Sequence, residues 1–235
     1  MKRKSFWNYL TKINCLGFKK QVMKDLNLSI NNKGIDLLKE NIGKEFISMR
    51  HDKFFKNFNS VSYVIEIETS IGRFAIFNDI EWFDNFCAGP NDLPFLDFKK
   101  LKQNEDPLNY QSEAETSITF INETILNILL IQDKADVFEN NKYIHQMNST
   151  EGIIIVTNKK QYGFYKENMW LDSEMLIWEG NNVVDKMEKL KDHFAIFGQP
   201  YNTKCKRYVI SLKDGIEKEI EQANVVGEIP DEEEL

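Results

Sequence analysis

The chain contains 235 residues, of which 42% are hydrophobic and 12% aromatic, and its formal net charge is −7. This composition indicates a globular protein and excludes an intrinsically disordered chain, while the acidic balance argues against general nucleic-acid binding. The length suits one large domain or two intimate halves, either of which can bury a core.

The first 24 residues differ from the rest of the chain in charge. They hold seven basic residues and no acidic residue, which leaves a formal charge of −14 on residues 25–235. Apolar residues recur in this segment at helical spacing: Phe6, Trp7, Leu10, Ile13 and Leu16. We therefore expect residues 1–30 to form a basic helical segment that lays its aromatic face on the acidic body. Contact with a membrane surface or a nucleic acid through residues 1–24 is the alternative.

One stretch of sequence occurs twice, in residues 64–84 and in residues 152–172. Aligned without gaps, the two copies share these identities: Ile65/Ile153, Ile67/Ile155, Thr69/Thr157, Trp82/Trp170 and Asp84/Asp172. In each copy a four-residue polar gap separates an apolar run from an aromatic-rich run. Apolar and polar residues alternate over the first run as in a strand, and Gly72 suits the turn of a hairpin. Each copy therefore predicts a β-hairpin.

Short elements are predicted before the first copy and near the end of the chain. Residues 35–42 suit one or two helical turns, closed by Gly43 in a left-handed conformation. Residues 45–51 suit a strand, and residues 206–212 alternate between apolar and polar side chains in the same way.

Three other segments are interpreted as helical. An amphipathic helix is expected over residues 183–194, with Asn182 as its N-cap. The apolar stretch at residues 93–101 is interpreted as its shorter counterpart after the first copy, disturbed by Pro94. Residues 123–131 combine helical apolar spacing with the β-branched density of strands, and we favour a helix there.

Together these elements predict an α+β fold, in which duplicated antiparallel β-meander or hairpin halves are accompanied by flanking helices. The halves would share one sheet or form two packed sheets, within a single compact domain or as two intimate halves. After the basic segment 1–30, the expected segments are a first β-rich half at 31–102, a polar connecting loop at 103–116, a second β-rich half at 117–225 and an acidic tail at 226–235.

No recognisable catalytic, metal-binding or cofactor-binding motif occurs in the sequence. The patterns GxSxG, GxxxxGK[ST] and GxGxxG are absent. His51, His145 and His193 lack the HxH or HExxH spacing of metal ligands. We therefore predict no catalytic residue, no metal site and no cofactor.

The cysteines and the apolar runs indicate a cytoplasmic protein. Cys15, Cys87 and Cys205 are isolated and form no CxxC pair, which favours a reducing compartment over a disulfide framework. No apolar run approaches the ~20 residues of a transmembrane helix, and the N-terminus lacks the pattern of a signal peptide.

Carboxylates in the first copy are the candidate binding residues. Glu66 and Glu68 alternate with the apolar positions of the predicted strand, so we expect them on its solvent-facing side. The second copy has isoleucine and valine at these positions, so only the first copy should keep an open face. A solvated acidic rim is the plain alternative. The candidate partner-binding residues are Glu66, Glu68, Asp79, Glu81 and Asp84.

Acidity, size and the absence of a catalytic motif favour a non-enzymatic, cytosolic protein-binding module. An immunity or antidote protein that neutralises a basic toxin is one such function. The first alternative is an enzyme with an acidic site near Trp82 and Trp170. The second is a membrane- or nucleic-acid-associated accessory protein that acts through its basic N-terminus.

Overall fold

The computed structural model describes residues 25–53, 61–62, 64–82, 92–108, 115–166, 175–193 and 201–226. The predicted basic helix within residues 1–24 and residues 227–235 of the predicted acidic tail lie outside these ranges. Asp84 and Trp170 of the repeated stretch also lie outside them.

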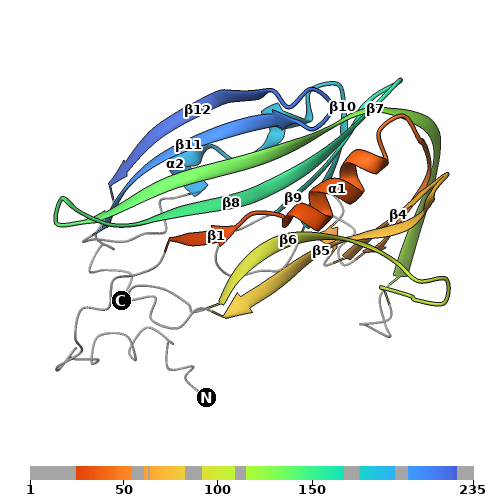
Figure 1. The fold of residues 1–235 in the computed structure, drawn as a ribbon, viewed down its shortest axis with the longest axis horizontal. Helices are drawn as coiled ribbons and strands as arrows, with labels where there is room; N and C mark the ends of the chain where they lie inside the picture. Colours follow the sequence, from red (N-terminus) through yellow and green to blue (C-terminus); the bar gives the residue numbers. More distant parts are fainter. Residues whose placement is uncertain are drawn as a thin grey trace, which may run out of the picture.

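The described residues form one sheet of twelve strands (Figure 1). Neighbouring strands of the sheet are antiparallel, except that β1 (Leu26–Leu28) pairs in parallel with β8. The main order is β3-β10-β9-β8-β7-β2-β4-β5-β6, and β11 joins β7 and carries β12 on its other side. The bounds are β2 (Glu45–Lys53), β3 (Val61–Ser62), β4 (Val64–Thr69), β5 (Gly72–Trp82), β6 (Asp92–Lys100), β7 (Glu115–Glu139), β8 (Lys142–Thr157), β9 (Gln161–Lys166), β10 (Met175–Gly180), β11 (Tyr201–Ser211) and β12 (Glu217–Val226).

Helix α1 (Asn32–Glu40) confirms the short helix predicted before the first strand. Asn31 caps it, because its side-chain oxygen accepts a hydrogen bond of 2.9 Å from the Gly34 amide. Gly43 follows the helix with a φ of +81°, the left-handed conformation expected of it. Strand β2 confirms the strand predicted from residue 45. None of the described helices is long and apolar enough to span a membrane.

The predicted α+β fold with flanking helices and duplicated halves is wrong. The described chain is mostly β, and α1 is its one helix of more than four residues. Both sequence copies do form hairpins in the same register, since Val64 pairs with Phe77 as Gly152 pairs with Tyr165. The hairpins nevertheless belong to one continuous sheet, because β7 spans 25 residues and pairs with β2 along one part and with β8 along the other.

Three helix predictions are also corrected. Residues 123–131 lie inside β7, where β2 pairs with residues 123–124 and β8 with residues from 125 onward, and a paired strand favours their β-branched side chains. Residues 93–101 form most of β6, whose position at the end of the sheet order tolerates Pro94. The helix expected over residues 183–194 is reduced to a 3-10 turn, η2 (Val183–Lys186), and the short α2 (Leu190–His193), and Asn182 makes no capping hydrogen bond.

The sheet folds back on itself at β7 and encloses the main core between two layers (Figure 1). One layer contains β2, β4, β5 and β6, and the other contains β8, β9 and β10 together with β11 and β12. Phe46 from β2 and Tyr162 from β9 meet across the core edge to face, with ring centroids 5.3 Å apart. Leu38 of α1 is fully buried in the same core. The inner faces are therefore committed to packing, which leaves the outer faces for binding.

Candidate functional site

The outer face of β7, β2, β4 and β5 carries two neighbouring rows of side chains. Residues that pair directly across strands point to the same side of a sheet, and so do residues two apart along a strand. The first row consists of Phe120, Ser48, Glu68 and Arg73, and the second row of Ile118, Arg50, Glu66 and Ala75. One face thus combines apolar side chains on β7 with charged side chains on β2, β4 and β5.

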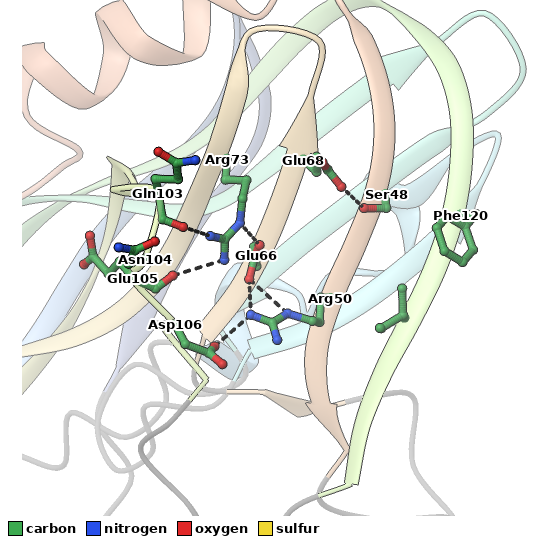
Figure 2. A pocket seen from close by; sticks show the side chains of 11 residues that line it. Ser48, Arg50, Glu66, Glu68, Arg73, Gln103, Asn104, Glu105, Asp106 and Phe120 are labelled. Carbon is green, nitrogen blue, oxygen red and sulfur yellow. Dashed lines mark hydrogen bonds and ion pairs between the residues drawn. The ribbon is translucent and has the colours of Figure 1, made fainter.

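Glu66 is the centre of an ion-pair network on this face (Figure 2). One of its oxygens accepts hydrogen bonds from Arg50 Nε at 3.0 Å and Arg50 Nη2 at 2.5 Å. The other oxygen accepts a hydrogen bond of 2.5 Å from Arg73 Nε. Arg50 Nη2 also lies 2.7 Å from Asp106 Oδ1. The two guanidinium groups therefore hold Glu66 between them and connect it to the loop that contains Asp106.

The loop of residues 101–108 covers the β4–β5 side of the face. Leu101 and Leu108 pack against Val64 and Ala75 in a small apolar cluster. Arg73 fixes the loop by donating hydrogen bonds to the carbonyl oxygens of residues 103 and 105, at 3.3 and 3.1 Å. This cover explains why Glu66 is only 6% exposed although it alternates with core residues along β4.

The network also determines the ionisation of its carboxylates. Burial alone would raise the pKa of Glu66, but hydrogen bonds and charges from Arg73 and Arg50 outweigh it and hold that pKa below its ordinary value. Desolvation would raise the pKa of Asp106 too, but hydrogen bonds from the Leu108 amide and Arg50, together with the charges of Arg50 and Arg73, outweigh it and lower that pKa. Glu66 is thus a permanent anion near neutral pH, which favours a structural role over general acid catalysis.

The β7 side of the face remains open to solvent. Phe120 is 76% exposed and Ile118 is 56% exposed. Many other apolar side chains of the same sheet are buried. Between these side chains and the loop lies a shallow depression of about 540 Å³, which we call the acidic depression. Four carboxylates and two arginines line it, so its formal net charge is −2: Glu66, Glu68, Glu105, Asp106, Arg50 and Arg73.

The structure describes the side chains of three of the five carboxylates proposed from the sequence and places these three differently. Glu66 is buried in the ion-pair network, whereas Glu68 is exposed and accepts a hydrogen bond of 2.9 Å from Ser48 Oγ. Asp79 is exposed on the same side of β5, four residues beyond the partner of Glu66 and therefore about 13 Å along the strand. Glu81 lies in β5, but its side chain is outside the described part of the structure, as is the whole of Asp84.

Sequence reasoning missed the residues that complete this site. Arg50 and Asp106 reach Glu66 from another strand and from a loop, and Phe120 belongs to a segment whose neighbours were unknown. One signal was present, because Leu101 and Leu108 enclose a polar loop and could have indicated that it folds back onto an apolar surface.

A second group of charged side chains is buried inside the other layer. Lys166 Nζ lies 3.0 Å from Glu151 Oε1, and Arg207 donates hydrogen bonds of 2.8 and 2.7 Å to the two oxygens of Asp133. All four side chains are at most 3% exposed. Each charge has an opposite partner, so we assign this group to the cohesion of β7, β8, β9 and β11.

Within the described ranges, no three histidine, cysteine or carboxylate side chains converge as a metal site would require. Comparison with known proteins adds no relative from which a role could be transferred. No protein-family model matches the sequence, and no match was found among curated proteins or solved structures.

Proposed function

We propose that this chain is a non-enzymatic, cytosolic protein-binding module, and that its partner is a basic protein. The observation that carries the proposal is the position of Phe120 and Ile118, both more than half exposed, directly beside the acidic depression. Exposed aromatic side chains next to charged groups are typical of binding surfaces, where a few such residues supply most of the affinity.

The charge of the site supports a basic partner. The depression has a formal charge of −2 and the whole chain a charge of −7, so a cationic surface would be attracted before contact. Glu68 is exposed and therefore accessible to a lysine or arginine of the partner. Glu66 contributes by positioning, because it fixes Arg50 and Arg73 and thereby the rim of the depression. Neutralisation of a basic toxin by an immunity protein is the function of this kind that we put forward.

Affinity capture from the organism that carries the gene tests the proposal. The wild-type protein, Phe120→Ala and Ile118→Ala would be immobilised, with Ile220→Ala on β12 as the matched control because Ile220 is also an exposed strand residue, 39% accessible. We expect the wild type and the control to retain a basic protein in stoichiometric amount, and the two β7 variants to lose it. Retention of the same protein by Phe120→Ala and Ile118→Ala would refute the proposed site.

A further inference from the structure

Strand β7 has two parts, which differ in the number of strands that pair with them. Residues 129–139 pair with β8 on one edge and with β11 on the other. Residues 115–124 pair with β2, and no other described strand pairs with them. The first part of β7 is therefore an edge strand within the described structure, although it continues into the middle of the sheet.

The backbone hydrogen bonds at the junction show which edge is open. The Ile125 amide donates to the carbonyl of Lys44 next to β2, at 2.9 Å. The Thr124 carbonyl accepts from the Asn158 amide in the turn after β8, at 3.0 Å. The backbone amide and carbonyl of one residue point to the same edge of a strand, and those of the next residue point to the opposite edge. β2 and β8 therefore lie on opposite edges of β7. The open edge is thus the one that β8 occupies further along the strand, beyond its turn at Asn158.

Within the described structure, this edge is less protected than the edges formed by β12 and β6. Residues 116–122 read TSITFIN, lie between Glu115 and Glu123, and contain no charged residue and no proline. A bulge interrupts the segment between Phe120 and Glu123, where Asn122 has a φ of +51°, so its regular part is residues 116–120. In β12, by contrast, four of the first five residues are charged, and β6 is packed against α1. Natural proteins protect exposed edges by charges, prolines, bulges or a covering element. Residues 116–120 show none of these devices within the described structure, and an apolar edge of this kind accepts another strand.

We propose that residues 116–122 of β7 bind an extended, basic segment of the partner by strand addition. This inference rests on the proposed function and specifies how the partner is recognised. Backbone amides and carbonyls of the segment would extend the sheet where β8 ends, and an apolar side chain of the segment would pack beside Ile118 and Phe120. The acidic depression lies on the β2 side of β7, so basic residues next to the strand would extend across Ile118 and Phe120 toward it and add electrostatic attraction.

Charge favours such a partner over a second copy of this chain. Pairing of two copies along this edge would bring two chains of formal charge −7 together, each with its own acidic depression of charge −2. A basic segment removes this repulsion and leaves the exposed apolar side chains covered. The charge selects a cationic strand as the occupant, and we assign it to the basic partner of the proposed function.

Synthetic peptides test this mode of binding with the full-length chain. The probe is a nine-residue peptide in which lysine alternates with valine, acetylated and amidated at its ends. Two further versions carry N-methyl groups either on all valines or on all lysines, so each lacks the amide donors of one edge and keeps every side chain. Strand addition uses only one edge of the peptide, so one methylated version should bind more weakly and the other should bind like the parent. We expect the weaker version to lose at least about tenfold in affinity, because each lost backbone hydrogen bond costs roughly two- to tenfold.

Amide hydrogen exchange locates the peptide on the protein. We expect the parent peptide to protect amides within residues 116–122, and we expect Ile118→Lys to weaken binding while the matched control Ile220→Lys leaves it unchanged. Absence of binding, equal binding of both methylated peptides, or protection outside this segment would overturn strand addition. The proposed function has its own readout, because capture of a basic protein that depends on Phe120 can persist when the peptide test fails. Capture of no basic protein by the wild type would refute the proposed function, and capture that does not depend on Phe120 would refute the proposed site, whatever the peptides do.

Discussion

Replacement of Glu66 by glutamine tests whether its ion pairs hold the 101–108 loop on the sheet. The substitution keeps the size of the side chain and removes the negative charge between Arg50 and Arg73. Three hydrogen bonds from guanidinium nitrogens then lose their ionised acceptor, at distances of 2.5 to 3.0 Å in the wild type. Breaking a fully buried ion pair costs about 3–5 kcal/mol, whereas an exposed pair contributes at most about 1 kcal/mol.

Glu66 lies between these limits. Its own side chain is 8% exposed, but Arg50 and Arg73 are 25% and 29% exposed and can be hydrated when their partner is lost. We therefore expect Glu66→Gln to lower the free energy of unfolding by about 1–3 kcal/mol, measured by urea denaturation at pH 7. Glu68→Gln is the matched control, because Glu68 is exposed and accepts one hydrogen bond from Ser48, so its loss should cost less than about 0.5 kcal/mol. Equal stability of Glu66→Gln and the wild type would refute the structural role assigned to Glu66.

Three more results are expected from the same geometry. The stability that Glu66 contributes depends on its lowered pKa. The difference in free energy of unfolding between wild type and Glu66→Gln should therefore be complete above about pH 5 and decrease as the pH falls below the ordinary glutamate pKa of about 4.3. Denaturation curves recorded from about pH 7 to about pH 3 measure this difference. Lys166→Met removes the ammonium group 3.0 Å from the buried carboxylate of Glu151 and should cost about 3–5 kcal/mol in urea denaturation. Addition of Glu151→Gln should restore part of this loss, and an unchanged midpoint for Lys166→Met would contradict the buried pair. Gly152→Ala would place a Cβ 2.2 Å from Tyr165 Cδ1, so it should lower the free energy of unfolding by about 1–3 kcal/mol in thermal or urea melts. The same substitution in a Tyr165→Leu background should cost less, and an equal cost there would contradict the clash.

The hairpins were predictable because their signals are local. Alternating side chains, a four-residue gap and Gly72 with a φ of +137° determine the β4–β5 hairpin without information from the rest of the chain. The second copy forms its hairpin in the same register, and both copies use their shared threonine in the turn. Sequence similarity over a hairpin therefore predicted the two hairpins but not the arrangement of the whole chain.

Elements that depend on distant neighbours were predicted incorrectly. The isoleucines at positions 121, 125 and 128 have helical spacing, yet they are buried in β7 because a bulge shifts its register between residues 125 and 127. Such a shift lets buried positions depart from strict alternation, and sequence periodicity does not distinguish it from a helical turn. The strands that pair with β7 and hold these residues in strand conformation, β2, β8 and β11, come from other parts of the chain.

The candidate site was predictable in its location and not in its chemistry. Alternation along β4 predicted that Glu66 and Glu68 share the solvent-facing side of the strand; they do share one side, but only Glu68 is exposed and Glu66 is buried. Alternation does not reveal that residues 101–108 fold back over Glu66, nor that Arg50 approaches it from β2. An open acidic patch was expected; the structure has an anion enclosed by two arginines and an exposed apolar pair on β7 beside it.

Equilibrium titration of the captured basic protein with purified variants tests the central claim most directly. We predict that Phe120→Ala binds this protein about 10- to 30-fold more weakly than the wild type, the effect typical of a central aromatic residue in an interface. Ile220→Ala should bind it with unchanged affinity, and both variants should unfold at the same urea concentration as the wild type, because both side chains are exposed. An affinity of Phe120→Ala within about twofold of the wild type would show that the partner binds elsewhere on the molecule.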